Sequence, residues 1–181
     1  MGPIALSALA LSLSSPATSA QHAAASPALA PVAASCPAAM TAVAAPKQEL
    51  AALRCGVNVV RQHFHLSDLR NAVALDRSAL LKADAIRRCG FSHTPCGTSF
   101  SQTFERTGYL GRSGIVGENL AWGQADLGSP VQTLAAWLAS PPHRANLLSR
   151  RWVDAGIAFE RGRMLGLDGI SLWVLDFGRR G

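Results

Sequence analysis

The sequence predicts an α+β fold, because segments with helical periodicity come early in the chain and strand-like segments come late. Residues 47–64 and 76–88 repeat apolar side chains at steps of three or four, which is typical of helices that bury one face. Residues 152–159 and 170–177 are rich in β-branched and aromatic side chains. The glycine-rich stretch 162–169 would join them as an antiparallel hairpin. A doubly wound parallel sheet is therefore not expected.

The chain length of 181 residues fits a single domain with an ordinary core. Residues 1–46 contain no Lys, Arg, Asp or Glu and are rich in alanine and proline. Such a segment has too few large apolar side chains to offset the entropy that it would lose on ordering. We therefore place the folded domain at residues 47–181 and exclude a large multidomain enzyme.

The chain begins with a pattern typical of exported proteins. Residues 4–13 form a short apolar run, and small residues follow it up to Ala20. The run is too short to cross a bilayer, which takes about 20 residues, although no basic residue precedes it. We expect a signal peptide at residues 1–20 and a disordered Ala/Pro-rich tether at residues 21–46. The mature chain would have no membrane span and would be secreted or associated with the cell wall.

The first helix is expected at residues 47–64, with Pro46 at its start, where proline is tolerated. The second helix, residues 76–88, repeats Leu80, Ala83 and Ile86 at steps of three and ends at Cys89 and Gly90. In this helix Lys82 and Asp84 would face solvent.

Shorter elements lie between the second helix and the hairpin. Residues 98–107 could form a short third helix, and residues 118–122 are a short strand candidate. Ser129 and Pro130 provide a cap and a proline at the first helical position, so another helix begins there. It ends near Ser140, where two prolines follow.

Four cysteines in a small exported chain usually form disulfides, and four cysteines allow three connectivities. Closeness in sequence favours Cys89–Cys96, and the remaining pair, Cys36–Cys55, would hold the end of the tether on the first helix. A zinc site made by Cys89, His93 and Cys96 is the alternative, but no fourth local ligand is evident.

The sequence lacks the familiar phosphate-binding, dinucleotide-binding, zinc-protease and serine-nucleophile motifs. Its formal charge is +6, with 15 Arg and two Lys. The arginines are scattered apart from three Arg-Arg pairs, so we expect a solvated basic surface and no nucleic-acid partner.

Three polar residues stand in unusual positions. His93 lies in the loop between Cys89 and Cys96, and Glu118 opens an apolar strand. His143 falls in the first turn of a short helix, where the positive end of the helix dipole would keep its imidazole neutral. Two imidazoles and a carboxylate could bind a divalent metal or exchange protons. Spacing alone does not separate such a site from ordinary capping and surface roles.

The chain also contains four ordered motifs that resemble those of a known family. The first is Phe91-Ser92-His93, and the second is Gly117-Glu118-Asn119-Leu120-Ala121-Trp122-Gly123. The third runs from Ala136 to Leu148 and includes Ser140-Pro141-Pro142-His143-Arg144-Ala145-Asn146, and the fourth is Trp173-Val174-Leu175-Asp176-Phe177-Gly178. Together they resemble the CAP superfamily (cysteine-rich secretory, antigen 5 and pathogenesis-related proteins), or SCP domain, in its bacterial branch. Asn58 and Arg61 match the first helix of that family.

The resemblance covers about residues 50–178 and implies an α-β-α sandwich with a small central antiparallel sheet. It also implies a cleft lined by His93, Glu118 and His143. The chain departs from the family at Ser140, where eukaryotic members often have a second Glu. It also has His63-Phe64-His65-Leu66 where a Gly-Leu pair is common, and we interpret both histidines as surface residues.

Two main hypotheses of function follow. In the first, a secreted domain binds an extracellular or wall-associated ligand (a peptide, lipid or glycan), with the three polar residues as anchors and a divalent metal such as zinc as a further candidate. In the second, the domain is a metal-assisted hydrolase or peptidase, with His93 and His143 as ligands and Glu118 as general base. A third is that the three residues form only a stabilising hydrogen-bond network. Binding is favoured because the motifs hold no strong nucleophile beyond Ser92, which has no separate base. We expect a monomer.

Overall fold

The computed structural model describes residues 26–41, 45–111, 113–164 and 166–181. The expected signal peptide, residues 1–20, and the first part of the expected tether lie outside these residues. No helix in the described part of the chain is both long and apolar enough to cross a membrane.

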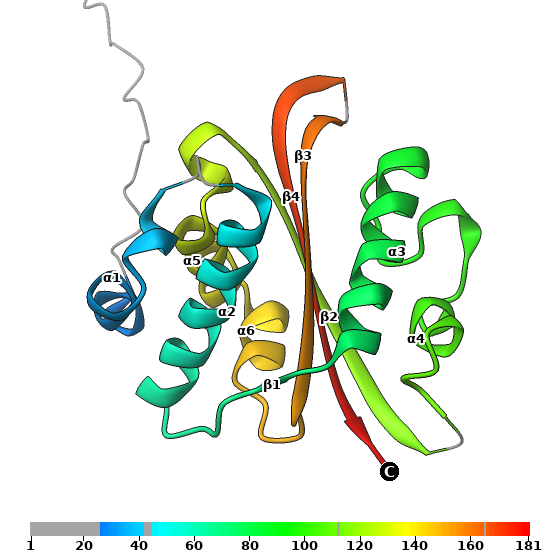
Figure 1. Ribbon diagram of the computed structural model, residues 1–181, viewed down its shortest axis with the longest axis horizontal. Helices are drawn as coiled ribbons and strands as arrows, with labels where there is room; N and C mark the ends of the chain where they lie inside the picture. The colour runs from blue at the N-terminus through cyan, green and yellow to red at the C-terminus, as the bar shows by residue number, and fades with distance from the viewer. Residues whose placement is uncertain (1–25, 42–44, 112, 165) are drawn as a thin grey trace, which may run out of the picture.

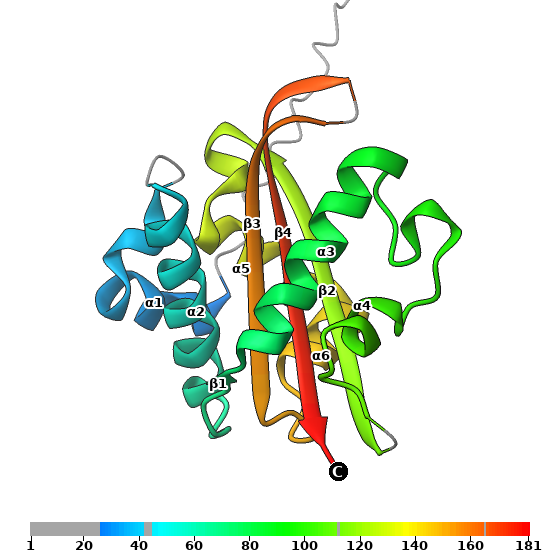
Figure 2. The same ribbon diagram turned by 45° about the vertical axis from the view of Figure 1, so that its right-hand side comes forward.

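The structure has three layers, with a sheet between two groups of helices (Figures 1 and 2). One side of the sheet is covered by α3 (Val73–Cys89) and α4 (Gln102–Arg106), and the other by α1 (Ala30–Ser35), α2 (Pro46–His63), α5 (Pro130–Ala139) and α6 (Pro141–Leu147). The strands are β1 (Arg70–Asn71), β2 (Gly114–Gln124), β3 (Asp154–Met164) and β4 (Leu167–Arg180). Short 3₁₀ turns cover Pro27–Leu29, Pro37–Met40, Pro95–Gly97 and Ala125–Gly128. The predicted α+β class is confirmed.

The four-stranded sheet has the order β1-β3-β4-β2. The three long strands are antiparallel neighbours, as expected, whereas β1 adds a two-residue parallel pairing with β3. The sheet is therefore mixed. The predicted hairpin is present but longer, because most of the glycine-rich stretch 162–169 continues the two strands. The strand candidate 118–122 is the middle of β2.

Side chains alternate between the two faces of the sheet. Leu120, Ala158 and Val174 pack against α3, in a cluster with Ala79, Ala83 and Ile86. Ile157, Trp173 and Phe177 face the other way and join the larger cluster with α2 and α5. This alternation sends neighbouring residues of β2 into different layers, which matters for the site described below.

Residues 26–41 do not form the disordered tether that their composition indicates. They make short helical segments whose buried side chains, Val32 and Ala39, pack in the main core. The Cys36–Cys55 disulfide fixes them to α2, so the folded part begins well before residue 47. Alanines give a weak hydrophobic signal in sequence, yet they allow these segments to approach α2 closely.

Both predicted disulfides, Cys36–Cys55 and Cys89–Cys96, are present. The zinc alternative for Cys89 and Cys96 is therefore wrong, because both sulfur atoms are oxidised in one bond. Of the predicted helix boundaries, α3 begins three residues earlier than expected, at Val73. Ser129 caps α5 by accepting from the Gln132 amide.

Candidate functional site

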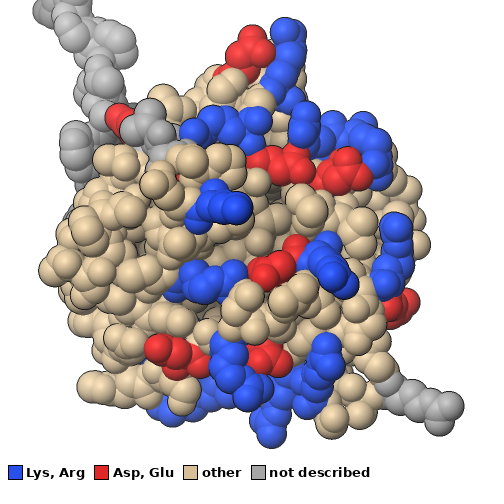
Figure 3. All heavy atoms as spheres, viewed as in Figure 1, with Lys and Arg blue, Asp and Glu red and all other residues tan. Residues whose placement is uncertain are grey.

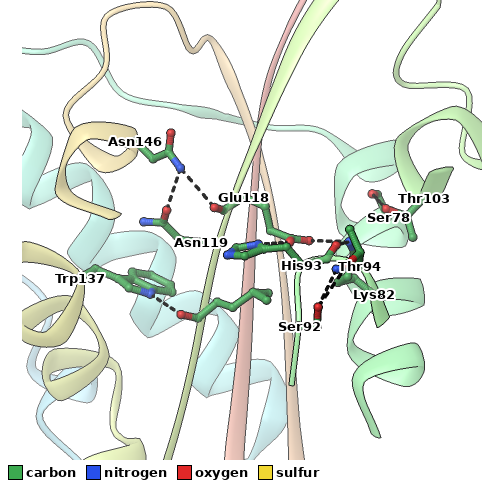
Figure 4. A network of polar contacts seen from close by, with 11 residues as sticks. Ser78, Lys82, Ser92, His93, Thr94, Thr103, Glu118, Asn119, Trp137 and Asn146 are labelled. Carbon is green, nitrogen blue, oxygen red and sulfur yellow. Dashed lines mark hydrogen bonds and ion pairs between the residues drawn. The ribbon is translucent and has the colours of Figure 1, made fainter. Parts of the chain in front are cut away.

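Glu118 is the centre of the polar network. It lies on β2, on the face that packs against α3, and its side chain has no solvent exposure. One carboxylate oxygen, Oε1, lies 2.7 Å from His93 Nδ1. The other, Oε2, lies 3.4 Å from Lys82 Nζ. Figure 4 shows the carboxylate between these two partners. Oε1 is thus hydrogen-bonded to His93, whereas Oε2 is buried beside the Lys82 ammonium and has no hydrogen-bond partner among the described residues.

Lys82 was expected to face solvent, and that expectation is wrong. Its side chain is 1% exposed and reaches the sheet, where it pairs with Glu118 and donates to the carbonyl oxygen of His93. Lys82 lies three residues after Ala79 and four before Ile86, so it belongs to the buried stripe of α3. This position in the stripe is the signal that could have identified it. A lysine is buried only where a partner compensates its charge.

His93 lies in the loop that follows α3, which the Cys89–Cys96 disulfide closes. Its side chain is half exposed, at 50%. Because a carboxylate only accepts hydrogen bonds, the contact with Glu118 places a proton on Nδ1. In the neutral form of the ring, the second nitrogen, Nε2, is then the one that can accept a hydrogen bond. Glu118 therefore fixes both the orientation and the tautomer of His93.

His143 joins the site from α6, on the other side of the sheet. Its carbonyl oxygen accepts a hydrogen bond of 3.0 Å from the Asn119 side chain, next to Glu118 in β2. Burial lowers the pKa of His143, and the nearby His93 lowers it further. The neutral state expected from the helix dipole thus has desolvation as its main cause. Among the described residues, His143 makes no direct hydrogen bond to Glu118.

The two motifs that carry Glu118 and His143 hold each other at the edge of the sheet. Asn146 of α6 donates to the Glu118 carbonyl at 3.2 Å and to the Asn119 side chain at 3.1 Å. Trp137 of α5 donates to the Leu120 carbonyl at 3.0 Å. Outward-facing carbonyls of an edge strand need such partners. Figure 4 shows the contacts of Asn146 and Trp137 with β2. These contacts hold α5 and α6 beside β2, and His143 lies on α6.

Asp176 is a second buried carboxyl that sequence reasoning missed. It lies directly across from Glu118 in the pairing of β2 with β4 and is fully buried. Burial raises the pKa of Asp176 well above its usual range, and the neighbouring Glu118 raises it further. The Ser78 hydroxyl and the Lys82 ammonium act in the opposite direction. No local pattern marks this residue, because its environment depends on strand register.

The donor set for a metal is limited. His93 and His143 are imidazoles of the predicted set, but the Glu118 side chain is enclosed, with Oε1 against His93 and Oε2 beside the Lys82 ammonium. In the described ranges, no group of three or more His, Cys, Asp or Glu side chains is arranged to hold a metal ion. The geometry fits Glu118 better as a partner that orients His93 than as a direct metal ligand.

Neither a family model nor a curated protein matches this sequence. Solved structures do match it in fold. An outer surface protein of Borrelia burgdorferi is similar, with a TM-score of 0.63 and 23% identity over 78% of this chain and 100% of that one. An extracellular protein with an SCP domain from Bacillus anthracis has a TM-score of 0.59 and 19% identity. This chain has the SCP-domain fold.

The match with the Bacillus protein covers 77% of this chain and 45% of that one. A cysteine-rich secretory protein of Staphylococcus aureus is also similar, with a TM-score of 0.56 and 18% identity over 77% of this chain and 40% of that one. This chain therefore spans less than half of these two proteins. The α-β-α sandwich that the CAP resemblance implied is confirmed.

Proposed function

We propose that this SCP domain binds an extracellular or wall-associated ligand, with His93 and His143 as the contacting groups. One observation supports this most: both oxygens of Glu118 are paired inside the protein, with His93 and Lys82. Glu118 therefore acts as a positioning residue that presents the His93 ring. The free Nε2 of His93 would accept a hydrogen bond from the ligand.

Binding explains this arrangement better than hydrolysis. A general base must reach the water that it activates, directly or through one water molecule. The Glu118 side chain has no exposed surface, and its two oxygens lie beside His93 and Lys82 and not beside solvent. The neutral state of His143 is equally suited to hydrogen bonding a peptide, lipid headgroup or glycan. A neutral imidazole can both donate and accept a hydrogen bond.

A metal-assisted hydrolase is the second candidate, and the contact between His93 and Glu118 is the observation in its favour. A carboxylate commonly orients a metal-binding histidine from outside the coordination sphere. His93 and His143 would hold the ion, and zinc in such a site would supply a hydroxide at neutral pH. In this version Glu118 keeps its positioning role, because it is enclosed.

Zinc titration by calorimetry separates the two candidates. The wild-type domain is compared with a His93→Ala/His143→Ala variant and with a control, His63→Ala/His65→Asn. The control removes two exposed histidines near the end of α2 and places Asn at position 65, where φ is 54°. Stoichiometric uptake that only the first variant abolishes would support the metal site. A folded wild-type domain without uptake would remove the hydrolase candidate.

Ligand binding itself is tested by NMR. The side-chain resonances of the histidines are followed while wall fragments, lipid micelles and peptides are added separately. We expect the ligand that binds to shift His93 and His143 and to leave His63 unchanged. If every ligand that binds leaves both site imidazoles unperturbed, the proposed function is wrong.

A further inference from the structure

A second candidate site lies where the end of α2 meets β1 and the chain that leads into β3. The structure has a cavity of about 420 Å³ there, which is within the range of small-ligand sites. Its lining residues are Arg61, Leu66, Ser67, Asp68, Arg70, Arg150, Trp152 and Val153. None of these residues belongs to the network around Glu118. Figure 3 shows Lys and Arg side chains gathered at the lower end of the viewed face, where β1 and the last residues of β4 lie.

Arg61 is the main feature of this cavity. It is only 1% exposed, although it carries a full positive charge. Its Nε donates to the Ser67 carbonyl, and its Nη1 donates to the carbonyls of Leu147 and Ser149. Within the described ranges Nη2 has no hydrogen-bond partner and Arg61 has no ion-pair partner. Burial lowers the pKa of Arg61, and the charge of the nearby Asp68 opposes this effect in part.

The same three carbonyl contacts make the cavity rigid. They tie the loop after α2, residues 64–69, to the turn after α6, so two walls of the cavity are fixed by one side chain. A preformed site loses little conformational entropy on binding. The buried guanidinium therefore holds the cavity walls together through its hydrogen bonds and also gives the cavity a positive potential.

The other charges leave the cavity positive. Arg70 is paired with Asp154, and the Asp68 carboxylate, which accepts a hydrogen bond from Gln62, offsets part of the charge of Arg61, so that Arg150 leaves the balance positive. Arg150 is exposed and makes no hydrogen bond or ion pair among the described residues. It is thus free to turn toward a ligand.

The remaining wall is apolar, formed by Leu66, Trp152 and Val153. Trp152 is held in place, because its ring stacks on Phe177 and its Nε1 donates to the Asn146 carbonyl. An apolar wall beside unpaired arginines suits a ligand with one charged and one apolar end.

We propose that this cavity binds an oxoanion, a phosphate or a carboxylate, attached to an apolar or aromatic group. The anion would contact Arg61 Nη2 and Arg150, which both line the cavity and have no ion-pair partner among the described residues. Arginine forms strong charge-assisted hydrogen bonds with both kinds of anion. The apolar part of the ligand lies against Leu66 and Trp152. This site is separate from the proposed His93 and His143 site, so either can fail without the other.

The test uses three probes, phenyl phosphate, benzoate and inorganic phosphate, with phenol as the uncharged control. Binding to the full domain is followed by tryptophan fluorescence and calorimetry at low and high salt. We expect phenyl phosphate or benzoate to bind more tightly than inorganic phosphate, phenol to show no binding, and salt to weaken the affinity. The stronger of the two aromatic probes identifies the kind of oxoanion.

Arg150→Ala is the decisive variant, because an exposed side chain can be removed without disturbing the fold. We expect it to lower the affinity about tenfold or more, as loss of a charged hydrogen bond does. Arg106→Ala on α4, an exposed arginine that does not line the cavity, is the matched control and should bind as the wild type does. The proposal is overturned if no charged probe binds at millimolar concentration, or if Arg150→Ala and Arg106→Ala have the same affinity.

Discussion

Replacing Lys82 by methionine should destabilise the domain strongly, because it leaves Glu118 buried without its cation. Lys82 Nζ lies 3.4 Å from Glu118 Oε2, and both side chains are almost fully excluded from solvent. At this separation, with an effective dielectric constant near 20, the attraction is about 5 kcal/mol. Measured losses on breaking buried pairs are about 3–5 kcal/mol. We therefore expect Lys82→Met to lower the free energy of unfolding by about 3–5 kcal/mol.

Urea unfolding followed by tryptophan fluorescence measures this loss. The chain offers a matched control, since Lys47 is its other lysine and is exposed at the start of α2. Lys47→Met should change the free energy of unfolding by less than about 0.5 kcal/mol.

A double-mutant cycle then isolates the interaction. In Lys82→Met/Glu118→Gln neither charge remains, so the double variant should be more stable than the sum of the single losses predicts, by about 1 kcal/mol or more. The reasoning is refuted if Lys82→Met unfolds within about 0.5 kcal/mol of the wild type, or if the two single losses simply add.

Three other results are expected. Gly156→Ala should lower the free energy of unfolding, measured in urea, by about 3 kcal/mol, because the added Cβ would clash with the Leu75 carbonyl carbon. Gly162→Ala is the control and should cause no such loss, since nothing lies within 4 Å of its added Cβ. Equal losses in the two variants would contradict this. In His93→Gln the pKa of His143, followed by NMR, should rise because the effect of His93 is lost, but it should stay below its ordinary value because burial persists. An unchanged pKa would show that the two rings do not interact. The raised pKa of Asp176 means that the folded state keeps a proton which the unfolded state loses near pH 4. As the pH rises from 4 to 7, the free energy of unfolding of Asp176→Asn should therefore increase relative to that of the wild type. A difference between the two proteins that does not change with pH would refute this.

Strongly periodic elements could be predicted from the sequence, and elements that depend on distant contacts could not. The helix α2 and the hairpin of β3 and β4 have clear periodicity, and both were expected within a few residues. The two residues of β1 pair only because α2 brings them beside β3, so no local pattern marks them. Residues 26–41 are ordered by a disulfide and by packing on α2, which composition does not show.

The residues of the candidate site also fall into two groups, those marked by local motifs and those defined by contacts between distant elements. The CAP resemblance leads to the prediction that His93, Glu118 and His143 form one site, whereas their spacing alone does not, and the contact between His93 and Glu118 is present. Lys82 and Asp176 were missed because each becomes a site residue only through a partner on another element. Lys82 needs β2 beside α3, and Asp176 needs the register that places it opposite Glu118. Such partners depend on tertiary structure.

The Cys36–Cys55 bond also determines what a protease could release from this domain. Residues 26–41 are joined to α2 by the main chain and by this bond. If the chain is cut between Thr41 and Ala45, the two fragments stay linked, and a non-reducing gel still shows one species. The small fragment separates only after a reductant is added. In an oxidising medium, therefore, nicking at that point would not expose the surface of α2 that these residues cover.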